Sequence, residues 1–171
     1  IGVTPEYFTI RSWSVSSGQY FTEADIRGAT KVCVIGQTIA DNLFKGNDPV
    51  GQVIRIKKMP FKIVGVLSPK GQSAQGTDQD DIIIAPYTTV QKKMTGQTYL
   101  GSILASAVTE DAMQDAQAQI TELLRVRHKL QPWDENDFTV RSQTEIATAA
   151  QSTSQVLTIL LASIASISLI V

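Results

Sequence analysis

Reactive side chains are scarce in this chain of 171 residues, which has one cysteine and one histidine. Cys33 lies in the apolar run Val32–Ile35 and has no second cysteine for a disulfide or a zinc site, so we expect a small buried side chain. His128 stands at the end of a predicted helix, where a cation suits the helix dipole. A Cys33–His128 pair of nucleophile and base is disfavoured, because Cys33 is expected to be buried. The sequence therefore predicts no catalytic site.

An excess of one charge is also missing. The 15 basic and 16 acidic residues give no electrostatic footprint for nucleic acid. The lysine pairs at 57–58 and 92–93 are far apart in the sequence and are interpreted as solvated faces. The acidic cluster at 78–81 lacks the glycine and glutamate positions of a calcium loop and is interpreted as a solvated loop. We expect no cofactor or metal in this chain.

Charged residues disappear at the C-terminal end. The segment from Ile146 to Val171 has none, and from Val156 the chain reads VLTILLASIASISLIV. This run is apolar around its whole circumference, which a surface helix avoids, and it contains small residues of the kind found between membrane helices. A spanning helix needs about 20 apolar residues, and the segment 156–171 has fewer. We therefore predict that this segment is the start of a transmembrane helix. The alternative is a buried core helix or a helix that pairs with a second chain.

The sequence Ser142-Gln143-Thr144-Glu145 predicts a capping box just before this segment. The Ser142 hydroxyl would accept a backbone N–H, and the Glu145 side chain would reach back to the cap. One continuous helix would then extend from Gln143 to at least Val171, over about 40 Å at about 1.5 Å per residue. Such a helix would join a water-soluble domain rigidly to a membrane, which is a geometry for transmitting motion.

The first hundred residues alternate between short strands and short helices. Apolar alternation and turn residues define the elements. They are a strand at Trp13–Val15, a helical turn at Thr22–Asp25, a strand at Lys31–Ile35, a helix at Gln37–Phe44, a hairpin of Val53–Lys57 and Phe61–Leu67 with its turn at Lys58–Pro60, a strand at Asp81–Ala85, and a short helix that Pro86 opens and that reaches Met94. Between them, Ser68–Gln79 is rich in Gly, Ser, Gln and Asp and is interpreted as an exposed mobile loop.

The pattern changes after Gly101. A strand at Ile103–Val108, a helix from Glu110 to about Arg127 and a strand at Phe138–Val140 would form a β-α-β unit. One face of the helix is apolar and consists of Ala112, Met113, Ala116, Ile120, Leu123 and Leu124.

Several short motifs occur in an order and spacing that are specific together. They are Gly2–Phe8, Gly18 with Phe21–Thr22 and Asp25, Val34–Gly36, Leu43–Phe44, Asp48–Gly51, Ile63–Val66 and the segment from Val156 onward. With them, nearly the whole chain resembles the extracytoplasmic domain of bacterial ABC-transporter permeases of the macrolide-exporter (MacB) type.

The resemblance implies an α+β fold, in which a porter-like β-α-β subdomain carries an inserted mixed α/β subdomain and is followed by the start of a transmembrane helix. Residues 1–20 and 101–142 would form the porter-like subdomain, residues 21–98 the insertion, and residues 143–171 a stalk helix that enters the membrane. The opening strand and helix of the porter-like part, the first membrane helix and the ATPase, with its ATP and Mg, would lie outside this sequence.

The family dimerises and works with a periplasmic adaptor protein and an outer-membrane exit duct. ATP hydrolysis in the cytoplasm moves the periplasmic domains and expels substrate already in the periplasm. The resemblance thus implies a non-enzymatic periplasmic domain on the bacterial inner membrane, anchored through residues 156–171. Related permeases release lipoproteins or signal without transport, and these remain alternatives, as does a soluble dimeric binding module.

Two groups of residues are predicted to carry the function. Ser142 and Glu145 would couple the stalk helix to the domain. The tip of the polar loop would contact the partner protein and consists of Gln72, Ser73, Ala74, Gln75, Gly76 and Thr77.

Overall fold

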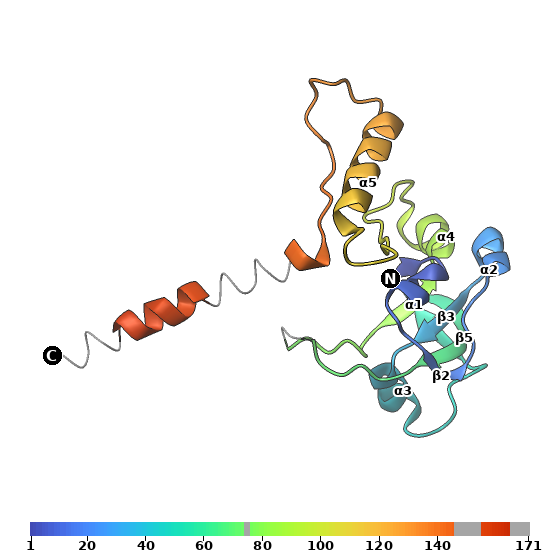
Figure 1. The fold of residues 1–171 in the computed structure, drawn as a ribbon. Helices are drawn as coiled ribbons and strands as arrows, with labels where there is room; N and C mark the ends of the chain where they lie inside the picture. Colours follow the sequence, from blue (N-terminus) through green and yellow to red (C-terminus); the bar gives the residue numbers. More distant parts are fainter. Residues whose placement is uncertain (74–75, 146–154, 165–171) are drawn as a thin grey trace. The chain divides into compact units, whose positions relative to one another are not determined.

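The computed structural model describes residues 1–73, 76–145 and 155–164 (Figure 1). Its contacts divide the chain into two units, and each is described here by itself. Unit 1 is Ile1–Ala105, and unit 2 is Ser106–Val171.

A six-stranded mixed sheet forms the centre of unit 1. Its path is β1-β6-β3-β5-β2, and β4 also pairs with β5. With 9 residues, β5 is long enough to take two partners on one edge: its first half pairs with β4 and its second half with β2. On its other edge β5 runs parallel to β3. The strands are β1 (Gly2–Val3), β2 (Val15–Gly18), β3 (Val32–Ile35), β4 (Val53–Ile56), β5 (Met59–Leu67) and β6 (Ile83–Pro86).

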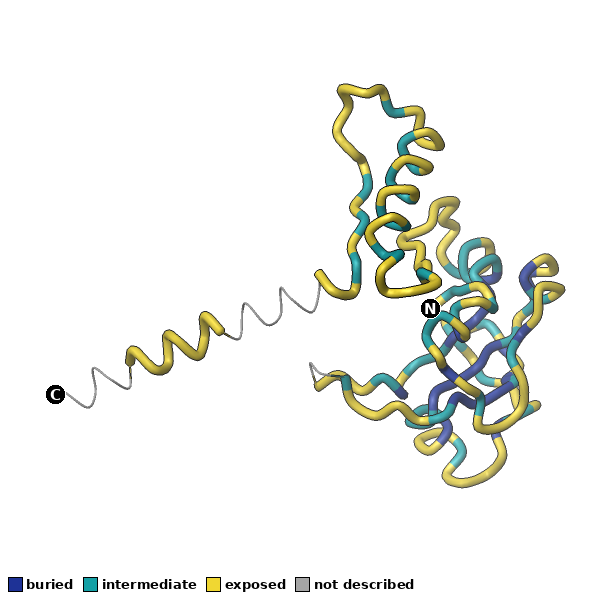
Figure 2. The backbone as a smooth tube through the Cα atoms, in the orientation of Figure 1, coloured by how far each residue is buried: buried dark blue, intermediate teal, exposed yellow. Residues whose placement is uncertain are grey.

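Apolar side chains alternate along β3, so both faces of the sheet are covered. Val34 lies in one buried cluster, whereas Cys33 and Ile35 lie in a second. The first cluster consists of Phe8, Trp13, Phe21, Ile26, Val34, Leu67 and Ile84, and the second of Cys33, Ile35, Ala40, Phe61, Ile63, Val66 and Ala85. Figure 2 shows the buried backbone concentrated in these strands. Each fully buried large apolar side chain contributes about 1.5–3 kcal/mol, so these two clusters hold unit 1 together.

Short helices pack against both faces of the sheet. Phe8 of α1 (Glu6–Ile10) and Ile26 of α2 (Glu23–Gly28) enter the first cluster, and Ala40 of α3 (Gln37–Phe44) enters the second. A capping box starts α2, where the Thr22 N–H donates to a carboxylate oxygen of Asp25 at 2.8 Å. After β6 the chain continues into α4 (Tyr87–Thr89) and the π-helix η1 (Val90–Thr95).

Most elements predicted for unit 1 are confirmed. Strand β3 and helix α3 form where the sequence predicts them, and Pro86 opens the short helix. The sequence predicts the hairpin turn at Lys58–Pro60, which starts one residue later than the turn in the structure. The observed turn consists of Lys57 and Lys58, because Ile56 pairs with Met59, and Pro60 lies inside β5. Proline is tolerated there because β5 pairs with β3 only from Lys62 onward, so Pro60 precedes the stretch of β5 that has partners on both edges.

Unit 2 is built around the helix α5 (Met113–His128), which confirms the longest predicted helix of this region. The predicted strands at Ile103–Val108 and Phe138–Val140 are wrong, because neither segment pairs with a strand among the described residues. Leu123 is 56% exposed and does not share the covered face of α5 that was predicted for it.

The predicted stalk helix lies largely outside the described residues, which omit 146–154 and 165–171. Residues 143–145 and 155–164 are helical. Within the part of the chain that the structure describes, no helix is long and apolar enough to cross a membrane.

Candidate functional site

The polar loop between β5 and β6 is a small hairpin held closed at its base. Asp80 is only 5% exposed, and its carboxylate accepts backbone N–H groups from Lys70 and Gly71 at 2.8 Å each. Above this clasp, the Ser73 N–H donates to the Thr77 carbonyl at 2.8 Å. The interpretation of the acidic cluster as merely solvated is therefore wrong for Asp80, which organises the loop.

A second set of hydrogen bonds, around Asp78, fixes the same loop to α3. One carboxylate oxygen of Asp78 accepts the Thr38 hydroxyl at 2.8 Å, and the other accepts the Asp80 N–H at 2.8 Å. Gln72 pairs with Asp78 as an isolated β-bridge. The sequence predicts an exposed mobile loop here, whereas these hydrogen bonds pair the two sides of the loop as a short hairpin.

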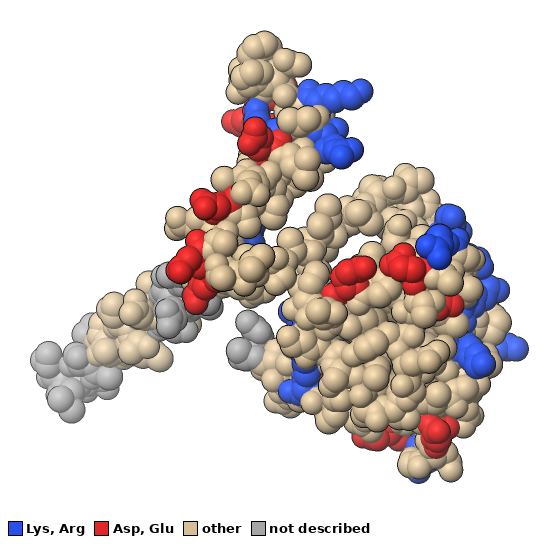
Figure 3. All heavy atoms as spheres, turned by 45° about the vertical axis from the view of Figure 1, so that its right-hand side comes forward, with Lys and Arg blue, Asp and Glu red and all other residues tan. Residues whose placement is uncertain are grey.

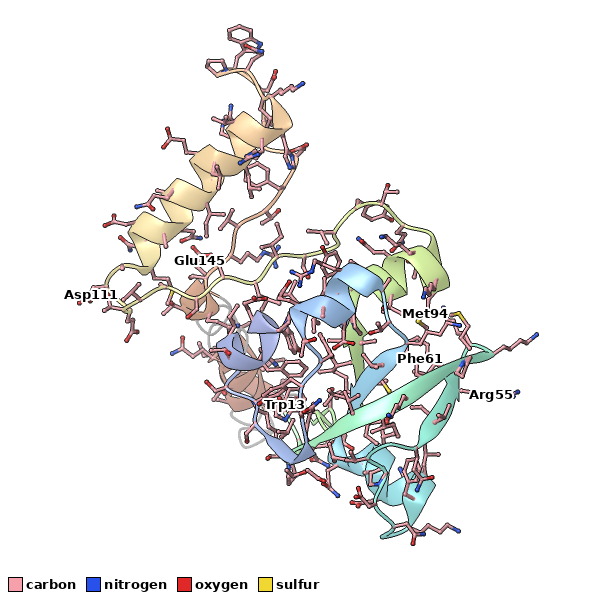
Figure 4. The ribbon with its side chains drawn as sticks, turned by 90° about the vertical axis from the view of Figure 1, so that its right-hand side faces the viewer. Trp13, Arg55, Phe61, Met94, Asp111 and Glu145 are labelled. Atoms are coloured by element: carbon pink, nitrogen blue, oxygen red, sulfur yellow. The ribbon has the colours of Figure 1, made fainter. Side chains whose placement is uncertain are left out.

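The start of the loop is tied to the segment before β2. The Trp13 indole N–H donates to the Ser68 carbonyl at 2.8 Å, and the Lys70 ammonium donates to the Arg11 carbonyl at 2.6 Å. The same ammonium lies 5.0 Å from the centre of the Trp13 ring, within range of a cation–π interaction. Figure 4 shows Trp13 in unit 1, where its side chain is only 3% exposed.

The predicted contact residues occupy the outer part of this hairpin. Gln72, Gly76 and Thr77 are exposed, whereas Ser73 is half-buried and its hydroxyl accepts the Thr77 N–H at 3.2 Å. The remaining two predicted residues, at 74–75, lie outside the described residues. A polar, uncharged tip on a rigid base can contact a partner, and that role stays a prediction.

The capping box predicted at the end of unit 2 forms. The Glu145 N–H donates to the Ser142 hydroxyl at 3.1 Å, and the Ser142 N–H donates to the Glu145 carboxylate at 3.2 Å. That carboxylate also accepts the Gln117 side-chain amide at 3.2 Å, from the middle of α5. The cap is thus tied to α5, a contact across 28 residues that no local motif indicates.

Further contacts bind the segment after α5 back onto that helix. The Arg125 guanidinium donates to the carbonyls of Gln131 and Asp134 at 2.6 and 3.0 Å, and to the Asn136 side chain. His128 Nδ1 lies 2.8 Å from a carboxylate oxygen of Asp137. Both side chains are substantially exposed, and an ion pair at the surface contributes at most about 1 kcal/mol to stability.

The cysteine is unsuited to chemistry. Cys33 is fully buried, and burial raises the pKa of its thiol to about 12. A thiol with that pKa stays protonated at neutral pH and is a poor nucleophile. Within the described residues, no group of three or more His, Cys, Asp or Glu could hold a metal ion.

The described residues thus define a small α+β domain with structural clasps and exposed polar surfaces. The chain belongs to the family of MacB-like periplasmic core domains, because the family matches residues 1–123.

Individual proteins agree with this assignment. The chain is 34% identical to the macrolide export ATP-binding/permease protein MacB of Syntrophobacter fumaroxidans, covering 99% of this chain and 31% of that protein. It is 38% identical to the protein of the same name from an Azoarcus species, covering 96% of this chain and 24% of that protein. The chain therefore spans about a quarter to a third of the length of these relatives.

Solved structures share the fold. The periplasmic region of MacB from Actinobacillus actinomycetemcomitans superposes with a TM-score of 0.69 at 25% identity, over 88% of this chain and 64% of that one. The extracellular domain of the noncanonic ABC-type transporter YknZ from Gram-positive bacteria gives a TM-score of 0.63 at 18% identity, over 76% of this chain and 64% of that one. At that identity the second match speaks for the fold alone.

Proposed function

We propose that this chain is the periplasmic part of an inner-membrane ABC permease. The permease would couple ATP hydrolysis in the cytoplasm to export of a periplasmic substrate through an adaptor protein and an outer-membrane duct. The membership of the MacB-like periplasmic core family carries this proposal, together with relatives named as macrolide export ATP-binding/permease proteins. ATP and Mg would bind outside this chain, in the nucleotide-binding part of a dimeric transporter.

The subdomains predicted from the sequence fit this proposal as follows. Residues 21–98 would be the inserted subdomain, and residues 101–142 would belong to the porter-like subdomain. Residues 1–20, assigned to the porter-like part, contribute β1 and β2 to the sheet of unit 1, and Phe8 of α1 packs in its first buried cluster. Residues 143–171 would form the stalk, with 156–171 entering the membrane.

Coupling would depend on the connection between the stalk and α5. Ser142 and Glu145 fix the first turn of the stalk, and Gln117 ties Glu145 to α5. A displacement of the stalk would then move α5 with it, because a capping box restrains the angle at which the chain enters a helix. Among the described residues, the restraints are two hydrogen bonds at the cap, the bonds from the Gln117 amide to Glu145 and to the Val140 carbonyl, and one from the Thr144 hydroxyl to the Met113 sulfur.

Transport by the complete permease tests the proposal. The full-length protein, expressed with its adaptor and duct in a strain that lacks its own macrolide exporters, should raise resistance to a macrolide and hydrolyse ATP. A complete protein that has no nucleotide-binding sequence and confers no resistance would exclude export as its function.

The coupling role has its own test. Ser142→Gly with Glu145→Gly removes both cap hydrogen bonds, so export should fall several-fold while ATPase activity is retained. Thr109→Gly is a control on the same unit, since the Thr109 hydroxyl accepts a single exposed N–H before α5. Full export by the cap variant would refute the coupling role and leave the transporter assignment untouched.

A further inference from the structure

The topology of unit 1 brings three separate stretches of chain to one end of the sheet: the passage from α2 to β3, the β4–β5 turn, and the passage from β6 to η1. Strands β3 and β5 run parallel, and β6 runs antiparallel to β3. The starts of β3 and β5 and the end of β6 therefore lie together. The end of α2 leads into β3 there, and η1 follows β6 there.

Hydrogen bonds join these segments directly. The Lys62 N–H donates to the Lys31 carbonyl at 2.9 Å, between β5 and the residue before β3. The Thr89 hydroxyl donates to the Thr30 carbonyl at 2.7 Å. The Lys93 ammonium donates to the Ala29 carbonyl at 2.7 Å. The three stretches thus form one continuous surface.

This surface, called the basic end below, carries eight of the eleven lysines and arginines of unit 1. They are Arg27, Lys31, Arg55, Lys62 and the lysine pairs at 57–58 and 92–93, and all are exposed. Figure 3 shows lysine and arginine side chains gathered along one margin of the unit, and Figure 4 shows Arg55 directed outward from β4. The lysine pairs, which are isolated in the sequence, are therefore neighbours on one surface.

Few carboxylates offset this charge. Within the described residues, the ion pair formed is His128–Asp137, so none of the eight cations is paired with a carboxylate. Glu23 and Asp25 of α2 are the acidic side chains on the elements of the basic end, and the Asp25 carboxylate already accepts hydrogen bonds from Thr22 and Thr30. No acidic residue occurs between Asp81 and Glu110, so η1 carries only positive charge.

The backbone at the tip of the basic end is strained. Lys57 and Lys58 form the two-residue turn of the β4–β5 hairpin with φ of 46° and 68°. This turn favours asparagine followed by glycine, because side chains disfavour the left-handed region. Strain of this kind costs stability and concentrates at functional sites. The sequence keeps two cations in the turn instead of relieving the strain.

The chemistry of the basic end favours a protein partner with a carboxylate-rich surface. Lysines dominate, and their mobile point charges suit long-range attraction more than the bidentate recognition that arginine provides.

We propose that the basic end is the surface on which an acidic face of the periplasmic adaptor docks, with Lys57 and Lys58 as its projecting tip. The inference rests on the proposed function, since it takes the adaptor as partner. It assigns the electrostatic contact to the end of the sheet opposite the polar hairpin of residues 70–79. Rim charges of this type accelerate association and make it sensitive to salt.

The test measures association of the purified adaptor with the full-length permease in nanodiscs by biolayer interferometry. Lys57→Glu with Lys58→Glu should lower the association rate constant about tenfold at low salt, and the difference should shrink toward about 0.5 M salt. Lys45→Glu with Lys129→Glu is the matched control. These two lysines are also exposed and left-handed, with φ of 48° and 58°, but lie outside the basic end. The control should bind like the wild type.

A second variant separates charge from folding. Lys57→Asn with Lys58→Gly relieves the strained turn, so it should raise the urea midpoint of unfolding while it slows adaptor association about threefold. A protein that is more stable and yet binds more slowly cannot have lost binding through misfolding.

Each remaining outcome decides the question. A wild-type permease that does not bind the adaptor refutes the proposed function. A wild type that binds, with both basic-end variants equal to it at every salt concentration, refutes the basic end alone. Basic-end variants that keep adaptor binding but lose binding to vesicles of phosphatidylcholine and phosphatidylglycerol would assign the surface to lipid and also overturn the proposal.

Discussion

The contact between Gly36 and the loop segment before β6 gives the sharpest stability prediction. A Cβ on Gly36 would lie 2.1 Å from the Asp80 carbonyl oxygen, against an ordinary contact of at least 3.4 Å. Gly36→Ala therefore forces the two backbones about 1.3 Å apart. The Gly36 N–H donates to the Ile82 carbonyl at 2.8 Å, so this separation breaks a buried hydrogen bond. The backbone at Gly36 has φ of −77°, so the effect is steric and not conformational.

The magnitude follows from the two losses. Overpacking against backbone costs about 1–3 kcal/mol, and a lost hydrogen bond costs about 1 kcal/mol, so the free energy of unfolding should fall by about 2–4 kcal/mol. With a urea slope of about 2 kcal/mol per molar, the midpoint should fall by about 1–2 M. Tryptophan fluorescence follows unit 1, because Trp13 is 3% exposed whereas Trp133 of unit 2 is 79% exposed.

Gly101→Ala is the matched control for this experiment. A Cβ on Gly101 would meet no atom within 4 Å. Its midpoint should therefore stay within about 0.2 M of the wild type, since exposed substitutions change stability little. A Gly36→Ala midpoint equal to that of the control would refute the close approach of these two segments.

Three further predictions address the clasp, the cap and the buried thiol. Asp80→Ala leaves two backbone N–H groups without their acceptor, which costs about 1–3 kcal/mol of local stability. The hairpin should therefore open, and limited proteolysis should cut between residues 70 and 79 at least ten times faster than in the wild type. A double-mutant cycle of Gln117→Ala and Glu145→Ala, read by thermal unfolding, should give a coupling energy of about 0.5–1 kcal/mol, whereas a value of zero would contradict the hydrogen bond between these two side chains. Burial raises the pKa of Cys33 from 9.0 to about 12, so the unfolded thiol ionises first and stability should fall as the pH rises from 9.0 toward 12. At pH 8, a thiol reagent should label Cys33 only after denaturant is added.

Local patterns in the sequence were sufficient for the middle of unit 1. The β-branched run before Gly36, the amphipathic spacing of Gln37–Phe44 and the alternation around the β4–β5 hairpin each fix an element without knowledge of its neighbours. The family resemblance, which rests on motifs from Gly2 to the segment after Val156, is also confirmed.

The failures concern features that depend on distant residues. Ile103–Val108 has the composition of a strand, but a strand needs a hydrogen-bonded neighbour, and none pairs with it in the described ranges. The residues of β1 are too few to be recognised, and their pairing with β6 spans more than 80 residues. Asp80 looked like a surface carboxylate because its two N–H partners belong to the other side of a loop.

The same reasoning explains why the candidate surfaces differ in predictability. The capping box of Ser142 and Glu145 is a four-residue motif and was found directly. The sequence alone does not predict the basic end, because its lysine pairs become neighbours only when β6 pairs antiparallel with β3. The two lysine pairs are far apart in the sequence, so only the topology of the sheet shows that they are neighbours.

The shared edge of β5 has a consequence for the order in which the domain folds. Strand β4 reaches β5 through a turn of two residues, whereas β2 must close a loop of about 45 residues to reach the same edge. We therefore expect the β4–β5 hairpin to form first, with β2 adding beside β4 and β3 adding to the opposite edge of β5. Since Lys57 and Lys58 form the turn of this hairpin, the cost of their left-handed backbone would then fall on the first folding step as well as on the native state.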